Sequence, residues 1–295
     1  MRVCLKAPDH LSRGIHRVAR ALETSRPAGL ELVQAREEAE LVVYHVIGLT
    51  GLRELVEADR DAGRRYAIVQ YCLLTTEDSR PEAWLDLWRG AAGVWSYYNL
   101  EAYLTARTPG FRTEPLGVRF YFAPLGVDGT VFQPARPTRK RFVIGTSGYV
   151  AETEGVKECY RAAVRVDREQ FHLGPYLELG PGVTYVLNVT DAEVAEMWSA
   201  CTYVAGLRRV EGFELPALEG LACGSRPIVF DAPHYRTWFG EHAEYIPEAS
   251  ADEVVEALVQ IFSRPARPVT PAERESVVAR FDWRVLAGTF WECIL

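Results

Sequence analysis

Residues 211–230 read EGFELPALEGLACGSRPIVF. Gly212 favours a turn, Pro216 suits the first turn of a helix, and Gly224 suits the end of that helix. The compact apolar run RPIVF that follows predicts a buried strand. We therefore expect a loop, a short helix and a buried strand, in that order.

The start of the predicted helix is suited to an anion. The first turn of a helix leaves backbone N–H groups without intrahelical partners and carries the positive end of the helix dipole. Glu211 lies in the preceding loop, and Glu219 lies about one helical turn past Pro216. Phosphate is the natural ligand of such a site. The alternative is an ordinary helix whose early glutamates complement its dipole.

The complete stretch resembles the glutamate–seven–glutamate signature of retaining glycosyltransferases with the GT-B fold, the glycosyl transferases group 1 family. The usual form of that signature is roughly EGFGLPxLEAMACGxPVV. The matching residues are Glu211, Gly212, Phe213, Leu215, Pro216, Glu219, Ala222, Cys223, Gly224 and Pro227. In this chain Glu214 stands at the position of the third-place glycine, Gly220 at that of alanine, and Leu221 at that of methionine.

The resemblance implies an α/β protein of GT-B architecture, with two Rossmann-like domains whose parallel sheets face each other across a cleft. Alternating strand and helix patterns along the chain agree with this class. The stretch PLGVDGTVFQP, residues 124–134, is similar to the inter-domain crossing of the family, usually PNGVDxxxFxP. We therefore expect an acceptor-side domain over 1–124 and a nucleotide-sugar-binding domain over 125–295. The last helix, 282–295, is expected to be able to pack back on the first domain.

Bulk composition is that of an ordinary globular protein. The 295 residues are 48% hydrophobic and 25% charged, with a formal net charge of −7, so a basic nucleic-acid-binding surface is not expected. No segment approaches the ~20 apolar residues of a membrane span. The opening MRVCLKAPDH lacks the character of a signal peptide, and the six cysteines form no C-x-x-C pair. These features favour a reducing, cytoplasmic location and no structural metal.

The N-terminal stretch predicts the opening of a Rossmann-like domain. MRVCLKAP reads as a strand, residues 9–14 as a loop, and residues 15–23 as a helix. Gly14 falls where the family often has a glycine pair that faces the donor phosphates. His45 lies near the end of the buried strand LVVYHV, at the edge where ligands bind in such sheets. In the family, a histidine after a comparable strand often lies near the donor sugar; a core histidine is the alternative.

A second strand, glycine turn and helix begin at RFVIGTSGY, with the helix expected near 155–164. This region is similar to the family's GRxxxxKG element, whose arginine and lysine neutralise the donor diphosphate. Gly148 and Gly155 align with the glycines of that element. Tyr149 stands at the arginine position, however, and Glu154 at the lysine position.

The two missing cations require a substitute if a diphosphate is to leave. Arg208 and Arg209 immediately precede the signature, and Lys157 follows the glycine turn. We expect one of the two arginines to compensate. Glu154 would repel a diphosphate if it pointed inward, so it is expected to face solvent or to pair with a cation.

The stretch VTYVLNVTDAEV predicts a strand, a turn and a helix capped by Thr190 or Asp191. In relatives the nucleobase stacks near such a turn, which makes Leu187, Asn188 and Val189 candidates. After the signature we expect a loop from residue 234, then a short strand and an amphipathic helix.

The function implied by the resemblance is retaining, metal-independent transfer of a sugar from a nucleotide-diphosphate donor to an acceptor hydroxyl. The donor would be UDP- or GDP-linked and would be a substrate, so no cofactor and no metal site are expected. Its diphosphate would contact the backbone of Gly212, Phe213, Glu214 and Leu215, and Glu219 would accept hydrogen bonds from the ribose. Glu211 would act near the reacting end of the sugar.

Two alternatives of other classes remain. One is a nucleotide- or sugar-binding module without turnover, and the other is a nucleotide-sugar epimerase or hydrolase on the same fold. The acceptor (glycan, small molecule, protein or nucleic acid) and the oligomeric state stay open.

Overall fold

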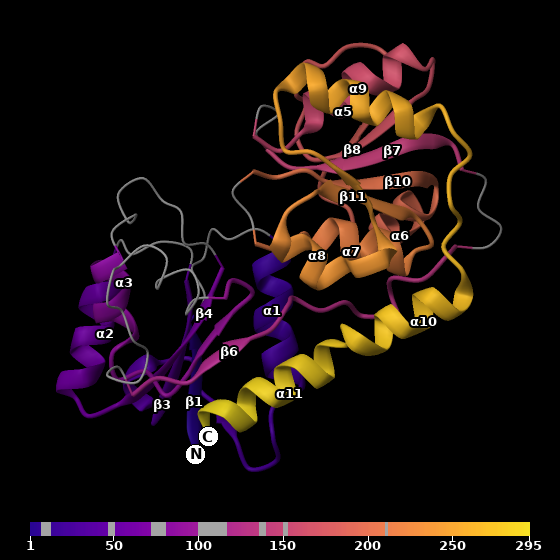
Figure 1. The fold of residues 1–295 in the computed structure, drawn as a ribbon. Helices are drawn as coiled ribbons and strands as arrows, with labels where there is room; N and C mark the ends of the chain where they lie inside the picture. The colour runs from indigo at the N-terminus through magenta and orange to yellow at the C-terminus, as the bar shows by residue number, and fades with distance from the viewer. Residues whose placement is uncertain are drawn as a thin grey trace. The chain divides into compact units, whose positions relative to one another are not determined.

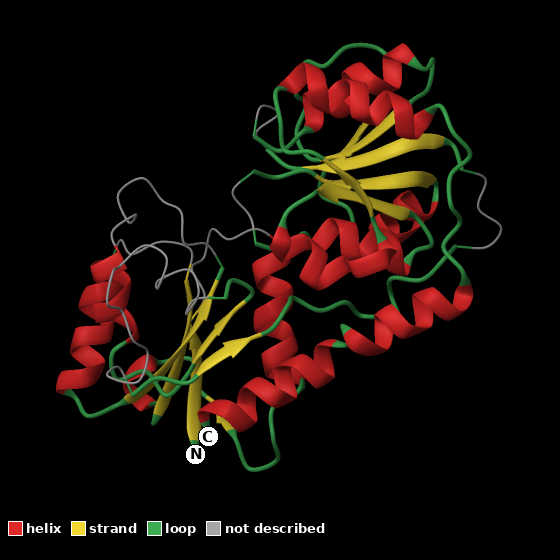
Figure 2. Cartoon of the chain, in the orientation of Figure 1, coloured by secondary structure: helices red, strands yellow, loops and turns green. Residues whose placement is uncertain are grey.

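The computed structural model describes residues 1–6, 13–46, 51–71, 81–99, 117–135, 140–149, 153–209 and 212–295, without the side chains of 13–15 and 81–83. The chain divides into two compact units, one of Met1–Gly126 with Trp283–Leu295 and one of Val127–Asp282. Each unit has its own parallel sheet with helices on both faces (Figures 1 and 2). The α/β class expected from the sequence is confirmed.

The sheet of the first unit is parallel throughout, in the order β2-β1-β3-β4-β5-β6. The order reverses between β1 and β3, so the switch point of this sheet lies there. All residues of β3 are buried, as its apolar run predicts for a parallel strand covered on both faces. The strands are β1 (Arg2–Lys6), β2 (Glu31–Leu32), β3 (Leu41–Val46), β4 (Arg65–Gln70), β5 (Val94–Ser96) and β6 (Phe120–Phe122).

The helices of the first unit include the last helix of the chain. The closing helix α11 packs beside α1, and the Trp291 indole donates a 3.0 Å hydrogen bond to the backbone oxygen of Leu22. The Phe290 ring on the same helix contacts Trp95 and Tyr121 of the sheet. The described helices are α1 (Arg13–Thr24), α2 (Leu52–Asp61), α3 (Pro81–Trp88) and α11 (Trp283–Ile294).

The start of α1 differs from the prediction. The helix begins at Arg13, so Gly14 lies in its first turn and not in the preceding loop. The first backbone N–H groups of a helix have no intrahelical partner, so a glycine there weakens the helix less than one in its interior.

The sheet of the second unit is also parallel throughout, in the order β12-β11-β10-β7-β8-β9. Its strands are β7 (Phe142–Ser147), β8 (Gln170–Leu173), β9 (Val183–Val186), β10 (Cys201–Gly206), β11 (Arg226–Phe230) and β12 (Glu244–Ile246). Helices α5 and α9 cover one face, and α6 and α7 cover the other (Figure 1). The helices described in this unit are α5 (Val156–Arg165), α6 (Asp191–Ser199), α7 (Leu215–Ala222), α8 (Pro233–Phe239), α9 (Ala251–Phe262) and α10 (Pro271–Arg280).

The described part of the signature stretch, 212–230, folds as its glycines and prolines predict. Helix α7 is followed by Gly224 in the left-handed region, at φ 80°, and then by the fully buried strand β11. One expectation nearby is wrong, because residues predicted as a loop form helix α8. Pro233 opens this helix, and the aromatic side chains of Tyr235, Trp238 and Phe239 are buried against the unit.

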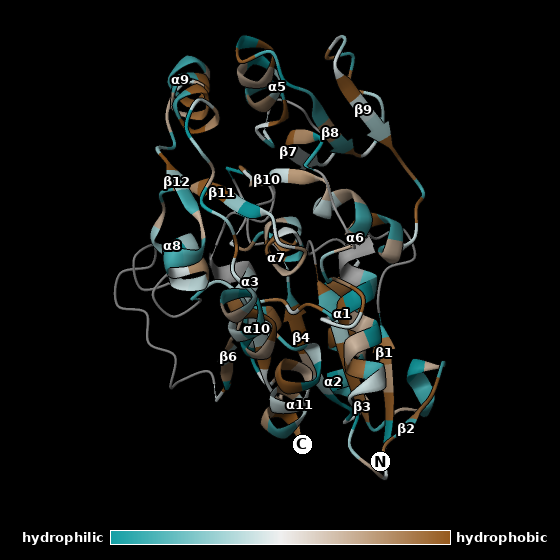
Figure 3. Ribbon diagram, turned by 90° about the vertical axis from the view of Figure 1, so that its right-hand side faces the viewer, coloured by the Kyte–Doolittle hydropathy of each residue, from teal (hydrophilic) through white to brown (hydrophobic). Residues whose placement is uncertain are grey.

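Hydrophobic residues line the strands of both sheets, as the colouring of β1 in Figure 3 illustrates. None of the described helices combines the length and the apolar character that crossing a membrane requires.

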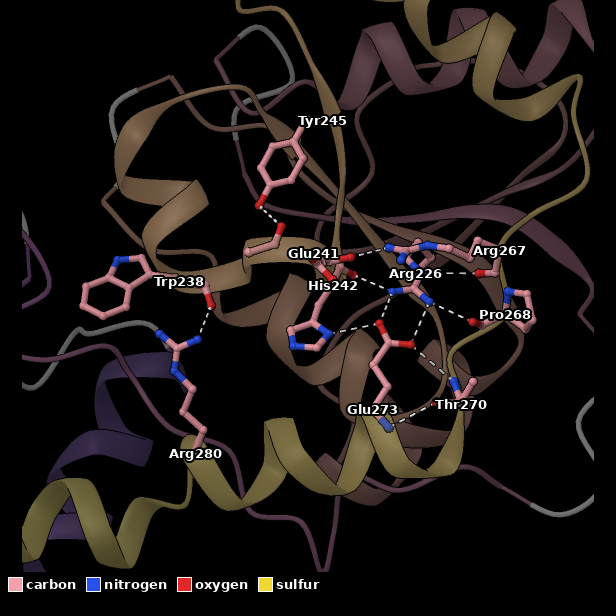
Figure 4. Close-up of polar contacts among 11 residues, drawn as sticks. Arg226, Trp238, Glu241, His242, Tyr245, Arg267, Pro268, Thr270, Glu273 and Arg280 are labelled. Atoms are coloured by element: carbon pink, nitrogen blue, oxygen red, sulfur yellow. Dashed lines mark hydrogen bonds and ion pairs between the residues drawn. The ribbon is translucent and has the colours of Figure 1, made fainter.

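A buried arginine holds the amino-terminal end of β11 to the segment before α10 (Figure 4). Arg226 is 1% exposed, forms a bidentate ion pair with Glu273 and donates to the backbone oxygens of His242 and Pro268, both at 2.8 Å. His242 Nδ1 lies 3.0 Å from Glu273 Oε1. Partial burial alone would raise the pKa of Glu273, but the hydrogen bonds from Arg226 and His242 hold it at about 2.

We expect Glu273→Gln to destabilise the second unit by about 3 kcal/mol at neutral pH, because it leaves a buried guanidinium without its counter-ion. The Glu273 pKa is depressed in the folded state, so this stabilisation is present above the ordinary carboxyl value of 4.5 and is lost as the pH falls to about 2. Urea denaturation across this range should show the difference between wild type and variant shrinking in acid. Glu275→Gln, on the exposed face of the same helix, is the control, and a pH-independent difference would contradict the assignment.

A second stability prediction concerns the contact of α7 with β10. A Cβ added at Gly220 would lie 2.5 Å from Cγ2 and 2.7 Å from Cβ of Val204. Gly220→Ala should therefore cost about 1–3 kcal/mol from overpacking, more than the gain in helix propensity of about 1 kcal/mol. Gly288→Ala in α11 is the matched control, since a Cβ there meets nothing within 4 Å and should stabilise its helix. Denaturation midpoints test both, and a stabilising Gly220→Ala would refute the close contact.

Candidate functional site

The carboxyl-terminal ends of β7 and β10 meet where the strand order of the second sheet reverses. From this pair, β8 and β9 follow on one side, and β11 and β12 follow on the other. Ligands of open parallel sheets bind at such a switch point, outside the carboxyl ends of the strands. The residues that follow β7 and β10 therefore make up the candidate site.

The turn after β7 is built around Gly148. Its φ is 142°, and the next backbone N–H, that of Tyr149, donates a 2.7 Å hydrogen bond to Glu154 Oε2. A Cβ on Gly148 would lie 1.9 Å from the same carboxylate oxygen. The glycine therefore makes room for the Glu154 carboxylate at the turn, while the Tyr149 side chain is 66% exposed.

Arg208, just past the end of β10, contacts this turn. Its Nε lies 3.1 Å from Glu154 Oε1, and its Nη2 donates to the backbone oxygen of Ser147 at 3.3 Å. Its Nη1 lies 2.9 Å from Glu214 Oε2. The expectation that Glu154 pairs with a cation is confirmed. A contact of Arg208 with a donor phosphate stays a prediction.

Glu214 fixes Arg208 from the start of α7. The Glu214 carboxylate is buried and also accepts hydrogen bonds from the Arg208 backbone N–H at 3.3 Å and from the Tyr235 hydroxyl at 3.4 Å. Burial raises the pKa of Glu214, and the Arg208 guanidinium opposes this rise. A Cβ on Gly206 would lie 2.7 Å from Glu214 Cβ, so the glycine at the end of β10 admits this side chain.

Arg209 has different neighbours. Its Nη2 lies 3.4 Å from Glu158 Oε1 of α5 and donates to the backbone oxygen of Ala249 at 3.4 Å. Its guanidinium lies 5.1 Å from the centre of the Phe230 ring. Of the two arginines singled out from the sequence, Arg208 is therefore the one that the structure brings to the glycine turn.

The start of α7 follows in the same loop. Gly212, Phe213 and Leu215 are buried. Glu214 is the Ncap residue of α7, but its side chain makes no capping hydrogen bond to the helix. The Phe213 ring stacks on Phe239 at 5.8 Å and belongs to the apolar core. The side chains of this segment are therefore buried, and the contact of a donor with its backbone stays a prediction.

Glu219 is buried within the second unit. Its Oε2 accepts a 3.3 Å hydrogen bond from the indole nitrogen of Trp198, whose ring packs edge-on against Phe171. Only 2% of Glu219 is exposed. This indole contact could not be foreseen from the sequence, and the ribose contact of Glu219 stays a prediction.

The remaining candidates of the second unit are spread more widely. Glu211 lies outside the described residues. Lys157 is exposed on α5, and Asn188 is exposed with φ 60° in the turn between β9 and α6. Of the two predicted caps of α6, Thr190 is the one observed, in a capping box with Glu193.

His45 lies in the first unit, near the end of β3, and is 3% exposed. Its Nδ1 is 2.6 Å from the Tyr71 hydroxyl, and the two rings stack. Its Nε2 is buried with no hydrogen-bond partner among the described residues. Burial, with a smaller effect of His16, lowers the pKa of His45 to about 3, so the imidazole is neutral at neutral pH. It can donate or accept a hydrogen bond, but it carries no charge.

No protein-family model matches the sequence. The sequence is 27% identical over 192 residues to the MMP alpha-(1->4)-mannosyltransferase of Mycolicibacterium hassiacum, a match that covers 58% of this chain and 46% of that protein. The chain therefore spans about half the length of the curated relative that it matches.

Solved glycosyltransferase structures superpose over nearly the whole chain. Anabaena HepE, solved with UDP and glucose, gives a TM-score of 0.73 at 13% identity, over 99% of this chain and 98% of HepE. The Rickettsia africae glycosyltransferase gives 0.71 at 11%, over 99% and 97% of the two chains. Sucrose-phosphate synthase of Thermosynechococcus elongatus gives 0.68 at 15%, over 97% and 79%. The fold is therefore that of the GT-B glycosyltransferases, and the resemblance stated from the 211–230 signature is confirmed at the level of the fold.

Proposed function

We propose that this chain is a glycosyltransferase that moves a sugar from a nucleotide-diphosphate sugar to an acceptor hydroxyl, with retention and without a metal ion. One observation carries the proposal. At the switch point of a GT-B chain, the glycine turn after β7 and the start of α7 are joined through Arg208. Backbone N–H groups and a guanidinium at one sheet edge are the groups that bind a diphosphate. The sequence likeness to a mannosyltransferase supports the reaction class.

The donor in this proposal is UDP- or GDP-linked and is a substrate, so no cofactor takes part. Its diphosphate would contact the backbone of residues 212–215 and the Arg208 guanidinium. Such fixed N–H groups stabilise the charge that develops on the leaving diphosphate as the glycosidic bond breaks. They are already in position, so they need no reorganisation at that moment.

The glutamate pair has separate roles in the proposal. Glu219 would accept hydrogen bonds from the ribose hydroxyls of the donor. Glu211 would contact the donor sugar near its reacting carbon, where an oxocarbenium-like transition state develops positive charge. His45 would contribute a neutral hydrogen bond through Nε2 to the donor sugar. Retention rests on the resemblance of the 211–230 signature to retaining enzymes.

One observation favours a second candidate, a nucleotide-sugar-binding module without turnover. Arg208 already contacts two carboxylates, those of Glu154 and Glu214. A site with this charge balance offers less stabilisation to a leaving diphosphate than one with two unpaired cations. The module would bind donors but release no product.

The proposal predicts that one class of nucleotide sugar stabilises the protein and is consumed only with an acceptor. A ligand at 100 times its dissociation constant stabilises by about 2.7 kcal/mol, which a thermal-shift panel of UDP- and GDP-sugars would detect. Transfer to hydroxyl acceptors, followed by NMR of the product anomer with and without EDTA, tests retention and metal independence. Stabilisation without product identifies the module. Consumption without acceptor identifies a hydrolase or epimerase, and no stabilisation by any donor refutes the proposal.

The glutamates should respond differently to substitution. Glu219→Gln keeps an oxygen for the Trp198 indole but weakens a ribose hydrogen bond, so donor binding should fall by about 0.5–1.5 kcal/mol with little change in melting temperature. Glu211→Ala should lower kcat far more than it raises the donor Kd, because the contact strengthens in the transition state. Calorimetry and steady-state kinetics separate the two effects, and unchanged parameters in both variants would remove the pair from the mechanism.

A further inference from the structure

We propose that the Glu154 carboxylate is an internal anion that occupies the phosphate position of the turn after β7, and that a donor diphosphate must displace it. This inference rests on the proposed function and adds a residue that selects the donor by charge. It assigns Glu154 a role opposite to that of a phosphate-binding cation.

The surroundings of Glu154 are those of a bound anion. One carboxylate oxygen accepts the Tyr149 backbone N–H at 2.7 Å, and the other lies 3.1 Å from Arg208 Nε. These two groups that bind the carboxylate come from two segments, the turn after β7 and the residues after β10. Gly148 admits the carboxylate, since a Cβ there would lie 1.9 Å from it. A glycine turn that offers a backbone N–H beside a guanidinium is a general anion-binding arrangement.

Arg208 does not depend on Glu154 for its position. Its Nη1 contacts the buried Glu214 carboxylate and its Nη2 contacts the Ser147 oxygen, while its backbone oxygen accepts from the Tyr235 hydroxyl at 3.1 Å. Departure of Glu154 would therefore leave a guanidinium already oriented toward the turn. The exposed fractions of the Arg208 and Glu154 side chains, 20% and 16%, leave both within reach of a ligand.

Displacement exchanges one anion for another, so its outcome depends on the ligand's charge. A diphosphate brings more negative charge and more acceptor oxygens than a carboxylate, whereas a nucleoside brings neither and gains nothing from the exchange. His172 adds no charge near this turn at neutral pH, because burial lowers its pKa to about 4 against the opposing hydrogen bond with the Gly148 backbone. Glu154 therefore competes with phosphate ligands for the turn, and only a ligand with more negative charge than a carboxylate gains from displacing it.

The test is calorimetry of Glu154→Gln with inorganic pyrophosphate, with UDP and GDP, and with uridine and guanosine. The variant keeps the shape of the side chain but loses its charge. We expect pyrophosphate and the diphosphates to bind at least about tenfold more tightly, since a like charge beside the ligand is removed. Nucleoside binding should not change. In Glu154→Gln/Arg208→Gln the gain should disappear.

Glu256→Gln is the matched control, because Glu256 pairs with Arg165 at an exposed site of the same unit and its loss changes the net charge equally. An equal gain in this control, or no gain in Glu154→Gln, overturns the inference. Absence of pyrophosphate binding in every variant also overturns it. If Glu154→Gln binds pyrophosphate more tightly but no variant transfers sugar, the inference stands and the proposed function is refuted. If the protein transfers sugar but Glu154→Gln gains no affinity for pyrophosphate, the proposed function stands and the inference is refuted.

Discussion

The guanidinium of Arg208 joins the segments that follow β7 and β10, the two strands between which the order of the second sheet reverses. It reaches Ser147 at the end of β7, Glu154 beyond the glycine turn, and Glu214 at the start of α7. The Glu214 carboxylate is buried, and without the guanidinium it would be an uncompensated charge that costs several kcal/mol. The positions of the turn and of the α7 start therefore depend on this one side chain, and the candidate site is built around it.

The fold could be predicted largely from turn and helix signals together with hydrophobic runs. Gly212, Pro216 and Gly224 mark the boundaries of α7, and the apolar run of β3 identifies a strand covered on both faces. Strand β8 was not predicted, because two of its residues are polar. Gln170 and His172 are buried and linked to Thr146 by side-chain hydrogen bonds, so the sequence carries little hydrophobic signal there. Such a network becomes visible only when β7 and β8 lie side by side.

The candidate site was predictable in its parts but not in its connections. The sequence singles out Glu154 and Arg208, but they are 54 residues apart, and nothing local indicates that they pair. Glu214 appeared as a departure from a glycine. The structure shows that Gly206, on the neighbouring strand, provides the space that this larger side chain needs. Arg226 likewise reads as the first residue of an apolar strand, whereas its ion pair with Glu273 explains how a guanidinium is kept inside. In each case the missing information is a contact between residues distant in sequence.

Because the last helix returns to the first unit, the first unit is the one completed last during translation. Phe290 and Trp291 complete the packing of α11 against the first sheet and α1, but they are synthesised after the whole second unit. During translation the first unit therefore lacks the helix that covers Trp95 and Tyr121. The second unit has its two ends paired in one β-bridge, between Val127 and Asp282, and it contains no residue of α11. The unit that begins later in the chain therefore has all of its residues translated before the first unit does.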